Sequence, residues 1–151
     1  EALKIRRELA EKSPDAYLSD LSDSCNNLAL LLHDTDSFRE AEELLQESLK
    51  IRRELAEKNP DAYLPDLAIS CNNLAYLLSD IGSFKEAEEL YREALKIRRN
   101  LAEENPKVYL PKLQLVCDNL TALLEKTGRR EEADSLRREV AEFYQKQLAQ
   151  Q

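Results

Sequence analysis

The sequence predicts an all-α protein built from stacked antiparallel helix hairpins, and three observations support this fold class. Only 2 of the 151 residues are Gly, and charged residues make up 34% of the chain, which is typical of helical proteins. Apolar residues recur every three or four positions over long stretches, as they do on the buried face of a helix. The stretch from Cys71 to Ile97 also recurs one block earlier from Cys25 and, in weaker form, one block later from Cys117. Such internal repetition is the signature of a helical repeat array.

The chain divides into a leading helix and three blocks of equal length, at 1–13, 14–59, 60–105 and 106–151. Residues 1–12 align with residues 93–104, so the leading segment is predicted to be an orphan second helix of a truncated repeat. Each block begins with Pro directly after a Ser or an Asn. This order suits a helix start, because Ser and Asn are good N-caps and Pro loses nothing at the first helical position. The length fits a single domain.

A first helix is predicted in each block from an apolar stripe, which in the second block contains Leu67, Cys71, Leu74, Ala75 and Leu78. Pro65 lies inside this helix. A proline in a helix removes one hydrogen bond and clashes with the preceding turn. We therefore expect a short helical turn over 60–64 and a kink or restart at residue 65.

A tight turn follows at Gly82, which can adopt the positive φ that ends a helix. Ser83 and Glu86 have the spacing of a capping box, in which each side chain bonds the other residue's backbone amide. A second helix is predicted over 83–104, about 33 Å long. Its stripe mixes small and large residues, at Ala87, Leu90, Tyr91, Ala94, Ile97 and Leu101. The alanines predict a close crossing of two antiparallel helices.

The last block loses this pattern toward its end. Arg137 stands where the second block has Tyr91, and Arg130 stands where it has Phe84. The terminal repeat of a solenoid becomes polar on its outer face, because nothing stacks on it. The change therefore predicts C-terminal capping character, with random drift as the alternative.

Three cysteines occupy one position in successive blocks, at Cys25, Cys71 and Cys117. Equivalent atoms of stacked helices lie roughly 10 Å apart, whereas a disulfide needs Cα atoms within about 7 Å. No Cys pair or Cys/His cluster has the spacing of a zinc site, so no metal is expected. We interpret the cysteines as buried small hydrophobic residues. Unpaired thiols favour a reducing compartment, and the predicted location is cytoplasmic.

An enzymatic activity is not expected from this sequence. His33 is the only histidine, and we interpret it as a surface residue because no nucleophile can be paired with it. No Gly-rich phosphate loop is present, so no cofactor is expected. The acid pairs that open the second helices are explained by the helix dipole. No residue is proposed as catalytic.

The charge pattern excludes two classes of partner. A net charge of −8 argues against nucleic acid and anionic membranes, which both require a basic face. No apolar run approaches the length of a membrane span. The recurring Lys-Ile-Arg-Arg phrases are followed by acids. We interpret them as i,i+4 pairs on a solvated helix face, such as Arg53 with Glu57 and Glu54 with Lys58.

The hairpin residues resemble the tetratricopeptide repeat (TPR), in its long-repeat, kinesin-light-chain-like branch. The matching positions are a large residue, Leu and a small residue in the first helix, Gly at the turn, and Ala, an aromatic and Ala in the second, here Cys71, Leu74, Ala75, Gly82, Ala87, Tyr91 and Ala94. Arg99 stands where the family has a Pro that ends the second helix, so that helix should continue. The resemblance implies a right-handed superhelical α-solenoid and a non-catalytic scaffold that binds proteins.

The resemblance also implies that the first helices line a concave groove that binds a peptide. By matching position, its residues are Asp23, Asn26, Asn27, Leu30, His33, Asp34, Ile69, Asn72, Asn73, Tyr76, Ser79, Asp80, Leu115, Asp118, Asn119, Ala122, Glu125 and Lys126. The Asn row offers donors and acceptors that could pair with the backbone of an extended peptide. The alternative is that these amides bond the adjacent repeat.

The predicted ligand is a neutral or basic protein segment. Family members that bind acidic chaperone tails place Lys and Arg in this groove, and that pattern is not matched here. Asp23, Asp34 and Asp80 favour the opposite charge. The alternative function is a structural or self-assembling module of a larger protein. Apolar residues near both ends, among them Leu3, Ile5, Leu9, Val140, Phe143, Tyr144 and Leu148, predict end-to-end self-association.

Overall fold

The computed structural model describes residues 1–151 and consists of helices joined by short turns. In chain order the helices are α1 (Ala2–Lys12), α2 (Pro14–Asp34), α3 (Phe38–Lys58), α4 (Pro60–Asp80), α5 (Phe84–Glu104), α6 (Pro106–Lys126) and α7 (Arg130–Ala149). We call α2, α4 and α6 the first helices, and α1, α3, α5 and α7 the second helices. The helix predicted over 83–104 is confirmed within one residue at its start.

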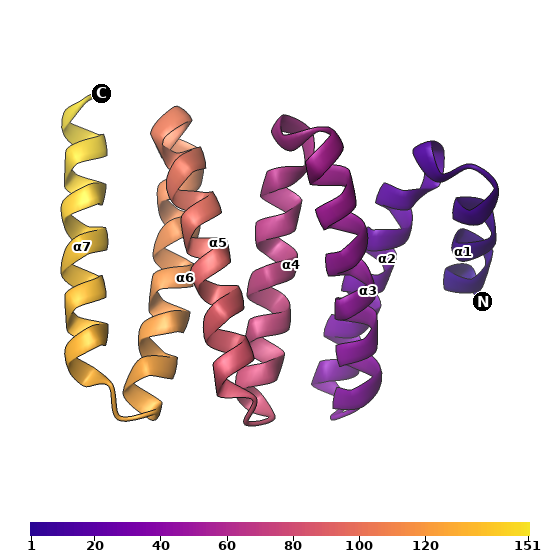
Figure 1. Ribbon diagram of the computed structural model, residues 1–151, viewed down its shortest axis with the longest axis horizontal. Coiled ribbons are helices and arrows are strands. Elements are labelled where there is room, and N and C mark those ends of the chain that lie inside the picture. The colour runs from indigo at the N-terminus through magenta and orange to yellow at the C-terminus, as the bar shows by residue number, and fades with distance from the viewer.

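The hairpins stack one after another, with the two chain termini at opposite ends of the array (Figure 1). Each helix packs against the helices that precede and follow it in the sequence. The architecture is the predicted all-α, right-handed solenoid of antiparallel hairpins. First helices therefore lie beside first helices, which lets side chains from all three repeats share one surface.

Small residues hold the paired helices close together. Ala75 of α4 and Ala87 and Ala94 of α5 are fully buried, with 0% of their surfaces exposed. Tyr91, on the same face of α5, is 2% exposed. These alanines are buried where α4 and α5 make the most extensive contact of any helix pair, as the predicted close crossing requires.

The turns between paired helices use a left-handed residue. Gly82 has φ 88° and Gly128 has φ 79°, while Asp36 takes the same place in the first repeat with φ 60°. Ser83 is the N-cap of α5, but its side chain makes no capping hydrogen bond. The predicted capping box is therefore wrong. The backbone closes this turn instead, because the Ser83 amide donates to the Leu78 carbonyl at 2.8 Å.

Pro65 does not divide its helix. The structure has one helix over Pro60–Asp80, so the expected restart at residue 65 is wrong. Pro65 lies only five residues after the helix start, and its missing amide would have bonded the carbonyl of Asp61 in the exposed first turn. Only this one hydrogen bond is lost, and packing of the buried Leu67 maintains the helix beyond it.

The C-terminal helix turns its apolar residues inward. Val140 and Phe143 are 4% and 7% exposed and pack with Ala102, Leu110 and Leu113. The guanidinium of Arg99 also covers the Phe143 ring at 4.7 Å. The prediction that these two residues present an apolar face at this end is therefore wrong. Of the four apolar residues predicted to form that face, only Leu148 is substantially exposed, at 46%.

Candidate functional site

The predicted site residues lie on the side of the first helices that faces away from the second helices. We call this surface the first-helix face. Its exposed members are Asp23, Asn27, Leu30, Asp34, Tyr76, Asp80, Leu115, Asp118, Ala122, Glu125 and Lys126. Its half-buried members are His33, Ile69, Asn73, Ser79 and Asn119, and Asn26 and Asn72 are buried. The structure thus brings most of the predicted residues to one solvent-facing surface.

Two asparagine pairs connect successive first helices. The Asn73 side-chain amide donates to Oδ1 of Asn26 at 3.0 Å, and that of Asn119 donates to Oδ1 of Asn72 at 3.1 Å. The sequence left two roles open for these amides, and the structure has the second, in which they form hydrogen bonds with the adjacent repeat. Asn27 has the same place in the first repeat and is exposed.

His33 joins the first two repeats rather than lying free on the surface. Its Nε2 is 2.8 Å from Oδ2 of Asp80, and its ring meets Phe38 and Tyr76 at centroid distances of 5.5 and 5.6 Å. The sequence interpretation of His33 as an isolated surface residue is therefore wrong. Tyr76 is held edge-on against this imidazole, yet 49% of its surface is exposed. An ordered, exposed aromatic ring is well suited to anchor a ligand.

The Lys-Ile-Arg-Arg phrases connect repeats, which corrects the prediction of i,i+4 pairs. Arg53 of α3 makes a bidentate pair with Glu93 of α5, not with Glu57. The same contact joins Arg7 to Glu47 and Arg99 to Glu139. The sequence alone could not distinguish the two partners, because Glu57 and Glu93 both recur at the period of the repeat. Arg53 holds the pKa of the Glu93 carboxyl below its usual value.

Arg52, the residue before Arg53, is buried between α2 and α4. Its Nη1 donates to Oγ of Ser70 at 2.8 Å and to the Asp66 carbonyl at 3.2 Å. Its Nη2 donates to Oδ1 of Asp23 at 2.7 Å. Asp23, a predicted site residue, is therefore partly neutralised by a cation that comes from the second-helix layer.

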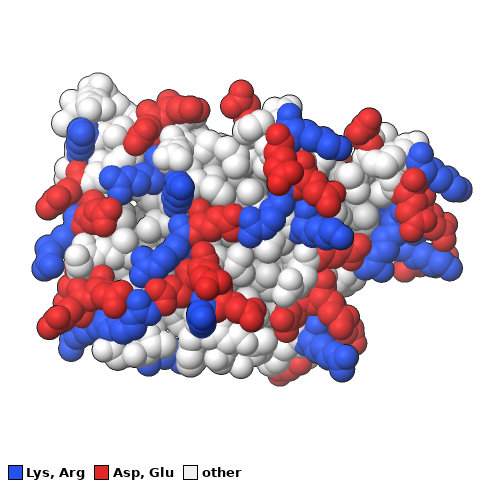
Figure 2. All heavy atoms as spheres, in the orientation of Figure 1, with Lys and Arg blue, Asp and Glu red and all other residues white.

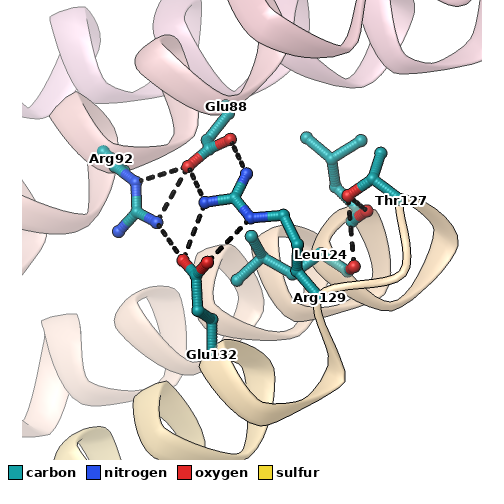
Figure 3. Close-up of polar contacts among 7 residues, drawn as sticks. Glu88, Arg92, Leu124, Thr127, Arg129 and Glu132 are labelled. Atoms are coloured by element: carbon teal, nitrogen blue, oxygen red, sulfur yellow. Dashed lines mark hydrogen bonds and ion pairs between the residues drawn. The ribbon is translucent and has the colours of Figure 1, made fainter.

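The last turn is held by ionic contacts (Figure 3). Arg129 occupies the N-cap position of α7, where the preceding repeats have Ser, and it binds Glu88 of α5 and Glu132 of α7. Arg92 completes the cluster by donating to Glu88 at 2.9 Å. Arg129 and then Arg92 hold the pKa of Glu88 below its usual value. These charges satisfy one another, so we assign this cluster a structural role.

The cysteines have no reactive character in this fold. Cys25, Cys71 and Cys117 are all 0% exposed and unpaired, as predicted for small core residues. Burial raises the pKa of Cys25 to about 12 and that of Cys117 to about 11, and it raises the pKa of Cys71 as well. A thiol that stays protonated is a poor nucleophile and a poor metal ligand. No group of His, Cys, Asp and Glu side chains is arranged to hold a metal ion.

A separate pocket of about 790 Å³ lies between α4, α5 and the start of α6, and none of the predicted site residues lines it. Its walls are formed by Leu64, Pro65, Ile97, Leu101 and Tyr109, among others. A pocket of about 510 Å³ lies in the matching place between α1, α2 and α3. The first-helix face is therefore an open surface, distinct from these pockets. No helix is both long and apolar enough to cross a membrane.

Comparisons with known proteins identify what this arrangement is similar to. Residues 26–100 match the model of the tetratricopeptide repeat. Among solved structures, the kinesin light chain-like protein BtubC (BKLC) from P. vanneervenii matches with a TM-score of 0.66 and 28% sequence identity. The match covers 95% of this chain and 53% of BtubC, so the chain spans about half the length of that protein. No curated protein matches.

Proposed function

We propose that this chain, whose residues 26–100 match the tetratricopeptide repeat, is a non-catalytic scaffold that binds a protein segment on its first-helix face. Tetratricopeptide repeats mediate contacts between proteins. The observation that carries the proposal is the exposure of large apolar side chains from three successive first helices. Leu30, Tyr76 and Leu115 are 42%, 49% and 51% exposed. Apolar anchors exposed beside polar groups mark binding surfaces.

The proposed ligand is an extended peptide or protein segment that is neutral or basic overall. Asp34 and Asp80 are the last residues of α2 and α4, and Asp80 lies 2.8 Å from the His33 ring, which packs against Tyr76. A carboxylate beside an aromatic face favours a cationic side chain on the ligand. Nucleic acid and anionic membranes are disfavoured by the net charge of −8. Lys/Arg and Asp/Glu are also interspersed, with no basic field, over the face drawn in Figure 2. We further propose a cytoplasmic location, since three unpaired thiols suit a reducing compartment.

Selection from a random dodecapeptide library displayed on phage tests this function. The immobilised chain is expected to enrich peptides, and Tyr76→Ala is expected to weaken a selected peptide by roughly 30-fold, as loss of an aromatic anchor does. Ile81→Ala serves as the control, because Ile81 is an exposed apolar residue outside the predicted face. Circular dichroism verifies that both variants stay folded. If Ile81→Ala weakens binding and Tyr76→Ala does not, the ligand binds elsewhere.

A second candidate function, self-assembly through the N-terminal end, is favoured by one specific observation. Leu28 and Leu31 of α2 are 37% and 64% exposed, whereas their counterparts in α4, Leu74 and Leu77, are each 1% exposed. The cause is visible in Figure 1, where α1 is much shorter than α3 and covers only part of α2. Ile5 is also 51% exposed, whereas Leu3 and Leu9 are half-buried against their own repeat.

This candidate predicts concentration-dependent association through the N-terminal end. Because Val140 and Phe143 are buried, we expect a contact between two N-terminal ends rather than a head-to-tail contact. Sedimentation velocity over a wide range of protein concentrations measures it. Leu31→Glu is expected to give a monomer throughout, whereas Leu148→Glu, at the other end, is expected to leave association unchanged. A wild-type chain that remains monomeric at the highest concentration contradicts this function.

A further inference from the structure

Arg98 is a buried cation for which the structure supplies no counter-charge. It is 5% exposed, and it takes part in no ion pair. Its Nη1 donates to the Lys112 carbonyl at 3.0 Å, and this is its only hydrogen bond. Burial lowers the pKa of Arg98. Withdrawing a charge from water without a partner is costly, so a buried guanidinium of this kind calls for an explanation.

The preceding repeat shows how the same position is satisfied. Arg52 lies 46 residues earlier and is equally buried, at 4% exposed. In both arginines Nη1 donates to the carbonyl of the residue fourteen positions further along, Asp66 for Arg52 and Lys112 for Arg98. The two guanidinium groups therefore share one equivalent contact. Nη2 of Arg52 then reaches Oδ1 of Asp23 on the first-helix face, at 2.7 Å.

The residues that surround Arg52 have become apolar around Arg98. Ile69 stands in the place of Asp23, and Val116 stands in the place of Ser70. Among fully enclosed side-chain nitrogens and oxygens, only Nε of Arg52 lacks a hydrogen-bond partner. The unpaired nitrogens of Arg98 are therefore not fully enclosed. We call these unpaired, partly exposed nitrogens the Arg98 corner.

The charges at the start of the first helix also change sign between these repeats. Asp61 and Asp66 at the start of α4 become Lys107 and Lys112 at the start of α6. Lys112 lies one helical turn before Leu115, which is half exposed on the first-helix face. Basic residues therefore gather at this end of α6, in a chain that is acidic overall.

We propose that Arg98, assisted by Lys112, binds a carboxylate side chain of the ligand beside Ile69, as Arg52 binds Asp23 in the preceding repeat. Ile69 and Leu115 flank the carboxylate and contact an apolar neighbour in the same segment. This inference rests on the proposed function and adds a direction in which the ligand binds. The ligand has an acidic residue near Arg98 and a basic residue near Asp34 and Asp80, and it is close to neutral overall. A bidentate pair with Arg suits such a carboxylate.

The first test uses the chain alone and restores the missing carboxylate. Ile69→Asp is expected to melt at least about 3 °C above Ile69→Asn, since the two residues have similar shape but only Asp can pair with Arg98. Asp23→Asn in the first repeat provides the reference, and it is expected to lower the melting temperature. If Ile69→Asp melts no higher than Ile69→Asn, the Arg98 corner does not hold a carboxylate and the proposal is wrong.

The second test uses the dodecapeptide library. Peptides selected on the wild-type chain are expected to share an acidic residue at a fixed distance from their apolar anchor. Selection on Arg98→Met is expected to lose the acidic residue and keep the anchor, while Tyr76→Ala is expected to lose both. An acidic preference that persists on Arg98→Met overturns this inference and leaves the binding face intact. A wild-type chain that selects no peptide contradicts the proposed function and the ligand named here, even if Ile69→Asp is stabilising.

Discussion

Ala87→Leu is expected to destabilise the protein strongly, by about 1–3 kcal/mol or more, because it overpacks a close helix crossing. Ala87 is fully buried in the first turn of α5 and belongs to the main core cluster, together with Ala75 and Leu78 of α4. Three additional carbons at this point have no free volume to enter, since protein interiors are packed as densely as organic crystals. The paired helices would have to separate, which would also disturb the stacking of the neighbouring repeats.

Urea denaturation followed by circular dichroism measures this effect. Ala141→Leu is the matched control, because Ala141 is an exposed residue of the helix α7 and the same change adds the same atoms there. The control is expected to stay within about 0.5 kcal/mol of the wild-type free energy of unfolding, as surface substitutions usually do. If the free energy of unfolding of Ala87→Leu also stays within about 0.5 kcal/mol of the wild type, the close α4–α5 crossing is not what maintains the repeat.

The fold could be predicted from the sequence because the repeats share one pattern of buried and turn residues. The spacing of Leu74, Ala75 and Leu78 fixes one buried face, and Gly82 fixes the turn with its φ of 88°. The effect of a single residue is harder to predict, because it depends on where the residue lies in its helix. Pro65 was expected to break a helix, but only one hydrogen bond near an exposed helix start depends on it.

The candidate site could be predicted only in part. Position within the repeat placed Tyr76, Leu30 and Leu115 on one exposed face, because helical periodicity determines which side chains point away from the core. Contacts between repeats could not be derived in the same way. The His33–Asp80 pair and the Asn73–Asn26 bond depend on how far one first helix is displaced relative to the next, and this displacement is a property of the assembled array.

The arginine positions show which information a comparison of repeats adds. Arg52 and Arg98 look identical in the sequence, within the same Lys-Ile-Arg-Arg phrase. Only the structure shows that Arg52 reaches across to Asp23 and Ser70, whose counterparts near Arg98 are apolar. A residue that differs between repeats therefore matters more where it contacts a neighbouring repeat than where it is exposed. Position 91 tests this with a larger expected loss of stability.

Tyr91→Arg is expected to destabilise the protein by about 3–5 kcal/mol, the range for losing a large buried aromatic side chain or burying an unpaired charge. Tyr91 is 2% exposed, in a core cluster that also contains Val116 and Leu120 of α6. The last block has Arg137 at this position, where the residue is exposed and its guanidinium binds Glu125 and Asp134. Arg is thus accommodated at the exposed position 137 and is expected to fail at position 91, because α6 covers that position.

The reverse change, Arg137→Tyr, is the matched control and is expected to leave the unfolding midpoint nearly unchanged, since residue 137 is exposed. Repeat arrays are stabilised by contacts between neighbouring repeats, so Tyr91→Arg is expected to uncouple α6 and α7 from the rest. Urea unfolding followed at each repeat by hydrogen exchange should then show α6 and α7 losing protection before α2 and α3. Loss of protection at the same urea concentration in all repeats would mean that the α5–α6 contact does not carry the stability assigned to it.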